Sequence, residues 1–330
     1  MGIQELPLGL FAKIIADVVA LETPGVAWKL RQVSREYSDY IKTEVFERQP
    51  LAAFIQFEAS SGNNRPQIIP LLRNKLYTFV FEHRKFIGAR DLLKETFGQI
   101  ADFLMPSMNH TTHRERVFWP LCRALASVRS GDAGAHAICL MLKDGSTTST
   151  PEDMTHEQRN LSTQFACATI MGNAAAMQDC LDKGVKVWDD GGFFEYPLAL
   201  AVRNHSQQSV NTILSHMPSG VTRATNEYAQ VHATLNKVIR DAFRCRDFGL
   251  AGIILDWYGN HMPVARVSLQ TRWLEAAFRS RDINIVASVL RVMNVQNGLV
   301  LPWYIYCQIL DTDDATIIKL CIQNKVFDVD

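Results

Sequence analysis

The sequence lacks long apolar runs and any excess of charge of one sign. No stretch approaches the ~18 consecutive apolar residues that a membrane-spanning helix requires. Residues 1–19 have no basic region, long apolar core or small-residue cleavage site of the kind found in secretory signals. Lysine plus arginine and aspartate plus glutamate each total 34, so no overall field attracts nucleic acid or an anionic membrane. We therefore expect a cytoplasmic or nuclear protein that binds neither nucleic acid nor a membrane.

Cysteine is sparse and follows no metal-binding or redox pattern. The seven cysteines are an odd number, and no two of them form a C-x-x-C motif. They lie inside apolar helical patterns, where a reduced cysteine packs as a small hydrophobic residue. We expect free thiols in a reducing compartment rather than structural disulfides.

Motifs for catalysis and for cofactors are also missing. The sequence has no glycine-rich loop followed by Lys-Ser/Thr, no G-x-S-x-G elbow and no H-E-x-x-H. His110 and His113 are three residues apart, but only Glu115 is close enough to be a third metal ligand, and the segment is predicted to be a loop. Pairs of aspartates such as Asp189-Asp190 fall in predicted turns, which aspartate favours. We expect no catalytic residue, no metal site and no cofactor.

What the sequence has instead is an internal repeat. Five segments align without gaps and start at residues 165, 198, 239, 274 and 306, so successive starts are 33, 41, 35 and 32 residues apart. The first residue of each segment, and the residues 3, 12, 15 and 16 places after it, are apolar in all five segments. In the first segment these residues are Phe165, Ala168, Met177, Cys180 and Leu181. This pattern predicts one structural unit that is repeated along the chain.

The spacing within each segment predicts a helical hairpin. The first two apolar positions lie on one face of a first helix, and the last three lie on one face of a second helix. A short polar break separates the two helices, for example Met171-Gly172-Asn173 or Thr312-Asp313-Asp314. Helices of about ten residues are not stable alone in water, so each hairpin must stack on its neighbours. We therefore predict an all-α fold that is an α-solenoid of helical hairpins.

Motifs at the ends of these hairpins resemble those of ankyrin repeats. Tyr196-Pro197-Leu198 and Trp119-Pro120-Leu121 are similar to the Thr-Pro-Leu of that family, and Asp182-Lys183-Gly184-Val185 is similar to the end of its second helix. The sequence departs from the family at Ala199, where ankyrin repeats have histidine, and the glycine between the helices survives only as Gly172. The resemblance covers residues 165–330 and, more weakly, 66–145. It implies degenerate ankyrin-type repeats that bind another protein.

The N-terminal segment has a second resemblance. Residues 1–50 contain two apolar stripes separated by Pro24-Gly25, and they open with Leu6-Pro7. With Leu30-Arg31-Gln32-Val33-Ser34-Arg35 in the second stripe, the segment resembles an F-box. In that family the segment docks on the Skp-type adaptor of cullin–RING ubiquitin ligases. The resemblance implies docking by Leu6, Pro7, Leu10, Ile14, Val33 and Tyr37.

The two resemblances together favour a non-enzymatic interaction protein. The chain is similar to the F-box-like/ankyrin-like proteins that are common in filamentous fungi, which implies a substrate receptor of a ubiquitin ligase with a client on the repeats. The alternative is a free-standing scaffold whose N-terminal helices only cap the solenoid. Exposure of Leu6, Leu10 and Ile14 favours docking, whereas packing of these residues on residues 50–90 favours capping.

An aromatic connection between the first two hairpins is the candidate client site. It combines aromatic and acidic side chains with a glycine pair, which is typical of interface hot spots. Its candidate client-binding residues are Trp188, Asp189, Phe193, Phe194 and Tyr196. Alternatively, Phe194 and Tyr196 pack in the core of the neighbouring repeats. Trp257-Tyr258 and Trp303-Tyr304 are expected to be buried.

The pattern divides the chain into four parts. Residues 1–50 form the F-box-like segment, 51–145 a helical region with one or two weaker repeats, 146–163 a linker and helix start, and 164–330 the degenerate repeats. The last helix carries five apolar residues, namely Ile317, Ile318, Leu320, Cys321 and Ile322. Because a terminal repeat should turn a polar face outward, we expect further repeats beyond residue 330, a partner protein or a second copy to cover this helix.

Overall fold

The described part of the protein is all-α. The structure, a computed structural model, describes residues 7–21, 24–30, 32, 35–49, 76–77, 92–108, 114–128, 156–189, 194–219, 222–225, 227–263, 265, 267–293, 303–324 and 326. These residues form 15 α-helices, one π-helix and one 3-10 helix, and they include no strand. The predicted all-α class is confirmed for this part of the chain. None of the described helices is both long and apolar enough to cross a membrane.

The chain divides into two compact units. Unit 1 comprises Met1–Cys180 and Gly191–Glu195, and unit 2 comprises Leu181–Asp190 and Tyr196–Asp330. The boundary therefore falls inside the segment 164–330 that the sequence assigned to a single run of repeats. The physical reason lies in the helix His156–Met171, which contacts the two described helices that precede it in unit 1.

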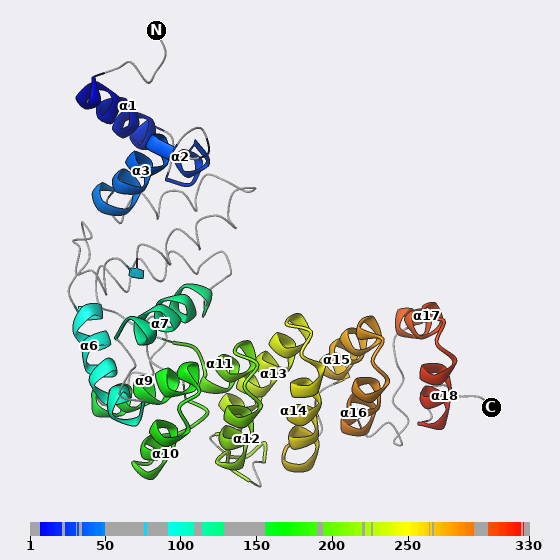
Figure 1. Cartoon of the computed structure of the whole chain (residues 1–330). Helices are drawn as coiled ribbons and strands as arrows, with labels where there is room; N and C mark the ends of the chain where they lie inside the picture. Colours follow the sequence, from blue (N-terminus) through cyan, green and yellow to red (C-terminus); the bar gives the residue numbers. More distant parts are fainter. Residues whose placement is uncertain are drawn as a thin grey trace. The chain divides into compact units, whose positions relative to one another are not determined.

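Unit 1 contains two groups of helices that contact one another within each group (Figure 1). The first group is α1 (Leu8–Leu21), α2 (Pro24–Leu30), α3 (Arg35–Thr43) and the π-helix η2 (Glu44–Arg48). The second group is α6 (Leu92–Leu104), α7 (Arg114–Val128) and α9 (His156–Met171). The 3-10 helix η4 (Met105–Ser107) follows α6. Helix α10 (Ala174–Asp182) follows α9, and its last two residues belong to unit 2.

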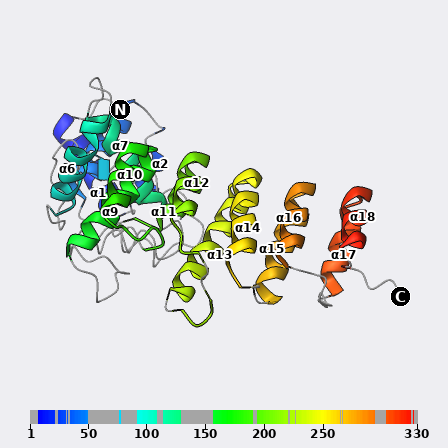
Figure 2. The same ribbon diagram turned by 90° about the horizontal axis from the view of Figure 1, so that it is seen from below.

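Unit 2 is built from four helix pairs. The pairs are α11 (Pro197–Arg203) with α12 (Gln207–Ser215), α13 (Tyr228–Arg244) with α14 (Phe248–His261), α15 (Val267–Ser280) with α16 (Ile283–Met293), and α17 (Trp303–Asp311) with α18 (Ala315–Gln323). The first helix of each pair contacts the first helix of the next pair, and the second helices do the same. Figure 2 shows α12, α14, α16 and α18 following one another in chain order. Successive pairs therefore share one packing arrangement.

The break between the two helices has the same backbone conformation in all five segments. The residue seven places after each segment start has positive φ, and these residues are Gly172 (φ 62°), His205 (φ 52°), Arg246 (φ 57°), Arg281 (φ 57°) and Asp313 (φ 50°). Each donates its N–H to the carbonyl oxygen three residues earlier, over 3.0–3.2 Å. Non-glycine residues adopt this left-handed conformation only rarely. Loss of the glycine in four segments has therefore not changed the turn.

The next residue of each segment caps the second helix. A side-chain oxygen of this residue accepts hydrogen bonds from N–H groups in the first helical turn, as it does for Asp282 with Asn284 (2.9 Å) and Ile285 (3.3 Å). The residues that cap in this way are Asn173, Ser206, Asp247, Asp282 and Asp314. All are residue types that favour this position because their short side chains satisfy otherwise unpaired helix N–H groups. The turn and the cap together set where each hairpin reverses.

The aligned apolar positions form the core of unit 2. All of them are buried in the segments that start at residues 198, 239 and 274. In the last segment Ile309 and Cys321 are buried, but Tyr306 and Ile318 are only half-buried and Ile322 is exposed. In the first segment only Leu181 is half-buried. The last hairpin therefore lacks cover on one side among the described residues.

Two sequence patterns are placed differently along the helices. Pro197 is the first residue of α11, whereas Pro120, in the similar motif, lies inside α7, which begins six residues earlier at Arg114. The second N-terminal stripe, which runs from Leu30 to Ile41, is divided between α2 and α3. In the second case an apolar spacing of helical type continued from the end of one helix to the start of the next.

Core burial predicts unequal effects of substitution at one aligned position. Leu290→Ala should lower the free energy of unfolding by ~2–5 kcal/mol, because it empties a buried site. Ile322→Ala, at the same position of the last segment, should cost less than ~1 kcal/mol, because this side chain is about half exposed. Denaturant titrations in dilute solution test both changes. Equal costs would contradict the assignment of this position to the core.

The left-handed turn predicts opposite effects at two glycines of unit 1. Gly172 (φ 62°) and Gly98 both leave open space where a Cβ would be added. Gly172→Ala should cost roughly 1–2 kcal/mol because of backbone strain. Gly98→Ala, inside α6, should gain roughly 0.5–1 kcal/mol because alanine loses less entropy in a helix. A stabilising Gly172→Ala in a denaturant titration would contradict the turn.

Candidate functional site

Helix α1 carries apolar side chains over about half of its circumference. Phe11, Ile15 and Val19, spaced four residues apart, are buried, and the Phe11 ring contacts that of Tyr40 in α3 edge-on at 5.1 Å between centroids. The adjacent apolar residues remain in contact with solvent. We call them the α1 stripe: Leu10, Ile14, Val18 and Leu21. Leu10 is 49% and Ile14 is 37% exposed, so the stripe is available to a partner.

Only part of the predicted adaptor site can be placed. Leu10 and Ile14 lie one turn apart on the α1 stripe. Pro7 is exposed just before α1, where its carbonyl oxygen accepts N–H groups of Leu10 (2.9 Å) and Phe11 (3.0 Å). Tyr37 lies in α3, but its side chain is outside the described residues, as are Leu6 and Val33. The structure thus places Leu10 and Ile14 on α1 and Pro7 directly before it.

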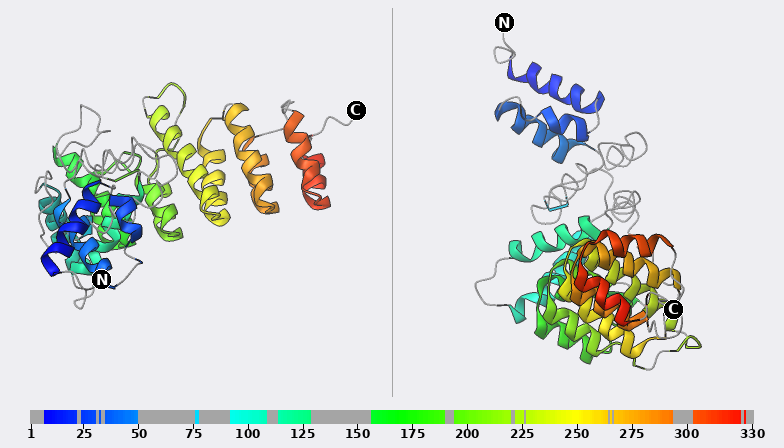
Figure 3. Two further views of the ribbon diagram at one scale, coloured as in Figure 1. Left: turned by 90° about the horizontal axis from the view of Figure 1, so that it is seen from above. Right: turned by 90° about the vertical axis from the view of Figure 1, so that its right-hand side faces the viewer.

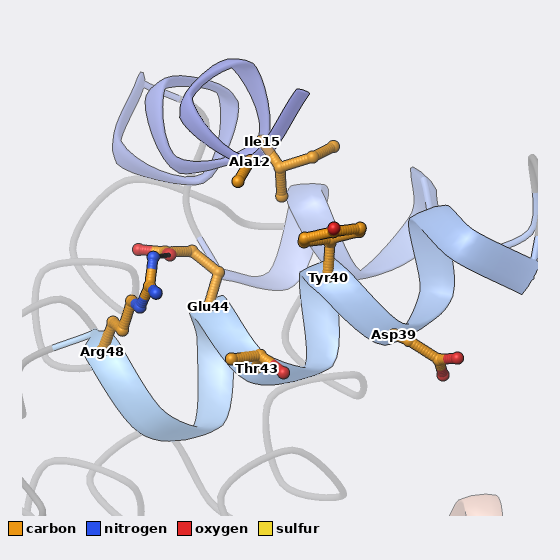
Figure 4. Close-up of a pocket in the computed structure, with 7 residues that line it drawn as sticks. All are labelled: Ala12, Ile15, Asp39, Tyr40, Thr43, Glu44 and Arg48. Carbon is orange, nitrogen blue, oxygen red and sulfur yellow. Dashed lines mark hydrogen bonds and ion pairs between the residues drawn. The ribbon is translucent and has the colours of Figure 1, made fainter. Parts of the chain in front are cut away.

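A pocket of about 270 Å³ lies between α1 and the α3–η2 segment (Figure 4). Ala12 and Ile15 line it from α1, and Tyr40 and Glu44 point toward them from the other side. Asp39, Thr43 and Arg48 complete the lining. Small-molecule sites usually have about 300–1,000 Å³. The volume of this pocket fits one side chain of a partner protein better than a whole small-molecule ligand.

Sequence reasoning did not identify the polar side of this pocket. Glu44 is buried, and its carboxylate accepts hydrogen bonds from Arg48 Nη1 (3.3 Å) and Gln49 Nε2 (3.2 Å). The N–H of Gln49 also donates to the carbonyl oxygen of Glu44 at 3.0 Å, which closes the wider turn of the π-helix. The sequence carried one indication of the Glu44–Arg48 pairing, namely the i, i+4 spacing of the two residues. No sequence pattern indicated the π-helix.

The aromatic connection is anchored rather than projecting. Phe194 is 1% exposed, and its ring stacks on Phe97 with centroids 6.3 Å apart and planes at 17°. Phe97 in turn stacks on Phe118 at 6.2 Å. The interpretation of Phe194 as a client-binding side chain is therefore corrected, because burial leaves no surface for a partner. Its alternative assignment to a core is the one that the burial supports.

The remaining predicted client residues are engaged within unit 2 or lie outside the described residues. Trp188, Asp189 and Tyr196 are half-buried, and Phe193 is not described. Asp189 Oδ1 accepts a hydrogen bond from Gln230 Nε2 at 3.1 Å. Burial raises the pKa of Asp189, although Lys186 and this hydrogen bond act in the opposite direction. Lys237 Nζ lies 5.6 Å from the centre of the Tyr196 ring, within cation–π range.

The other aromatic pairs differ in exposure. Tyr258 is buried against Trp273, with ring centroids 5.1 Å apart, as expected. Trp303 and Tyr304 were expected to be buried but are exposed. Both belong to the first turn of α17, and no described helix lies beyond the α17–α18 pair.

Metal-binding and nucleophilic side chains were sought among the described residues because either would indicate chemistry. Among them no group of three or more His, Cys, Asp or Glu side chains is placed to bind a metal ion. His110 and His113 lie outside the described residues. Burial raises the pKa of Cys122 and Cys167, and that of Cys321 to about 12. These thiols stay protonated at neutral pH, whereas nucleophilic cysteines need the thiolate.

The aromatic stack predicts that Phe194 contributes to stability. Phe194→Ala should lower the free energy of unfolding by about 3–5 kcal/mol. A double-mutant cycle with Phe97→Ala should give a coupling of about 0.5–1.5 kcal/mol beyond the lost burial, because the two rings stack directly. Denaturant titrations of the four proteins measure both values. If Phe194→Ala leaves the free energy of unfolding unchanged, Phe194 becomes a candidate for the client site again.

Comparisons with known proteins give no match. No family model matches the sequence, and neither a curated protein nor a solved structure is significantly similar to it.

Proposed function

We propose that the protein is a non-enzymatic interaction module that acts as a substrate receptor of a cullin–RING ubiquitin ligase. Its N-terminal helices dock a Skp-type adaptor. Its C-terminal hairpins form an ankyrin-type α-solenoid that holds a client protein. The α1 stripe is the single observation that carries the docking part of the proposal.

The shared hairpin geometry supports the solenoid part. Five segments have a left-handed residue at the same place, followed by the same kind of cap. In unit 2 the first helices contact one another in succession, and so do the second helices. Stacked units that contact only their neighbours are the defining property of a solenoid.

The exposed side of α1 supports adaptor docking over simple capping. If α1 only capped other helices, its apolar side chains would be buried, because leaving them in water forgoes ~25 cal/mol per Å². Leu10 and Ile14 are instead exposed beside a helix face that is buried. An amphipathic helix of a partner can lie along such a stripe with anchors at i and i+4.

The pocket beside α1 supplies a second element of recognition. Its apolar wall comes from Ala12 and Ile15, and its opposite wall carries the phenol of Tyr40 and the paired carboxylate of Glu44. One side chain with an apolar stem and a polar tip would find partners for both parts here. The stripe would provide affinity, and the pocket would fix the position of the bound helix.

The client site is proposed on the repeats, with a reduced set of residues. Trp188, Asp189 and Tyr196 keep partial exposure in unit 2, and Phe194 is excluded by burial. A tryptophan and a tyrosine that keep part of their surface accessible are typical anchors in protein interfaces.

Affinity purification of the full-length protein from its native organism tests the docking part. The wild-type protein should co-purify with a Skp-type adaptor and a cullin. The double variant Leu10→Asp/Ile14→Asp should reduce recovery of both by at least ~10-fold, since two charges then face an apolar partner surface. Lys13→Asp is the matched control, because Lys13 is exposed on α1 outside the stripe.

Thermal melting of the three proteins shows whether the variants remain folded. Absence of adaptor and cullin from the wild-type sample would contradict the proposal. The remaining candidate would then be a free-standing scaffold whose N-terminal helices only cap the solenoid. Equal recovery with the double variant would remove the α1 stripe from the docking site.

A further inference from the structure

A pocket lies between the third and fourth helix pairs of unit 2, at the end where the chain turns between paired helices. Figure 3 shows the pair α17–α18 (red) beside the pair α15–α16 (orange). The pocket has a volume of about 310 Å³ and is lined by the ends of α15 and α17 and by the turns that follow them. We call it the turn pocket, and its lining residues are Phe278, Arg279, Arg281, Gln308, Asp311 and Thr312.

Two arginines of the turn pocket keep donors for a ligand. Arg281 is exposed and forms no ion pair or side-chain hydrogen bond with a described residue. Arg279 forms one ion pair, from Nη2 to Oε2 of Glu275 at 3.3 Å, and its side chain is still 69% exposed. A guanidinium has five N–H donors. Both arginines can therefore donate to an acceptor that enters the pocket.

The α17 side of the turn pocket offers acceptors. Gln308 Oε1 is buried and has no hydrogen-bond partner among the described residues. The carboxylate of Asp311 lines the same pocket and forms no ion pair with a described residue. Native structures satisfy nearly all buried acceptors. The amide of Gln308 therefore points to a donor that the described residues do not supply.

The junction between the first and second pairs shows which group the same positions bind. Arg203, which lies five places after its segment start as Arg279 does, donates from Nη2 to Asp241 Oδ2 at 3.0 Å. Asp241 is buried and lies two places after its segment start, where the last segment has Gln308. The third and fourth pairs thus have the arginine of this interaction and lack its carboxylate.

We propose that the turn pocket binds an aspartate or glutamate residue of the client protein. The carboxylate of this residue accepts hydrogen bonds from Arg279 and Arg281, as Asp241 does from Arg203. Its backbone N–H donates to Gln308 Oε1. The inference rests on the proposed function only in that the ligand belongs to the client, and it does not require the adaptor.

An acidic residue of a peptide fits this pocket better than a phosphate of a nucleic acid. The peptide residue brings an acceptor and an N–H donor within a few bonds of each other, which matches Arg281 on one side and Gln308 on the other. A phosphate group has acceptors only, so it would leave Gln308 Oε1 unpaired. It would also lie beside the carboxylate of Asp311, and like charges in an interface are unfavourable.

Titration of the full-length chain with short peptides tests the proposal. The probes are acetyl-Gly-Ser-Asp-Ser-Gly-amide and the same peptide with asparagine in place of aspartate, followed by nuclear magnetic resonance of the arginine side chains. The aspartate peptide should bind at least ~10-fold more tightly than the asparagine peptide, because only its carboxylate forms charge-assisted hydrogen bonds with the arginines.

Substitutions separate the turn pocket from a general effect of charge. Arg281→Gln should weaken binding of the aspartate peptide at least ~10-fold. Arg246→Gln is the matched control, because Arg246 has the same place in its segment and the same φ of 57° but does not line the turn pocket. Gln308→Asp should also weaken binding at least ~10-fold, because it supplies the carboxylate that Asp241 provides in the first junction. Circular-dichroism melting shows whether each variant is folded.

The proposal is overturned if the two peptides bind equally, if the aspartate peptide does not bind at up to ~10 mM, or if Arg281→Gln keeps wild-type affinity. An equal loss in Arg246→Gln would show that only general charge is at work and would also overturn it. Tighter binding of a short single-stranded oligonucleotide at the same arginines would assign the pocket to nucleic acid instead. The titration needs neither adaptor nor cullin, so its failure is distinct from their absence in the affinity purification.

Discussion

The left-handed residue between paired helices is the constraint on which the arrangement of the described hairpins depends. In unit 2 it reverses the chain in very few residues, so two short helices lie against each other and present their apolar positions on one side. His205, Arg246, Arg281 and Asp313 adopt this conformation without being glycine. Their strain of roughly 1–2 kcal/mol each is offset by the adjacent cap and by burial of the aligned positions in neighbouring pairs. Local strain and packing between pairs are thus coupled along unit 2.

Periodicity was sufficient to predict the helix pairs, because the apolar positions and the polar breaks both lie within about 20 residues. It did not predict where one compact unit ends. That boundary depends on contacts such as the one between Phe97 and Phe194, which are far apart in the sequence. Periodicity also joined Leu30 and Ile41 into one stripe, although α2 ends at Leu30 and α3 begins at Arg35. An apolar spacing has no information about the backbone conformation between its members.

The candidate sites were predictable to a different extent. The sequence identified Leu10 and Ile14, but half of α1 is apolar, and spacing alone does not say which part faces water. For the aromatic connection, residue types typical of an interface are also typical of a core, and Phe194 belongs to the second class. The polar wall at Glu44 depends on a π-turn that no local pattern encodes. Exposure is a property of the packed structure, so it becomes visible only there.

The position of Phe194 has a consequence for dividing the protein into pieces. The chain crosses between the two units after Cys180, after Asp190 and after Glu195, so the segment Gly191–Glu195 returns to unit 1 before unit 2 continues. No single cut separates the units cleanly. A fragment ending at Cys180 would leave Phe97 without the ring that stacks on it, and a fragment beginning at Tyr196 would lack Asp189, the hydrogen-bond acceptor of Gln230. The covalent path therefore makes the two units inseparable by simple truncation, even though each has its own core.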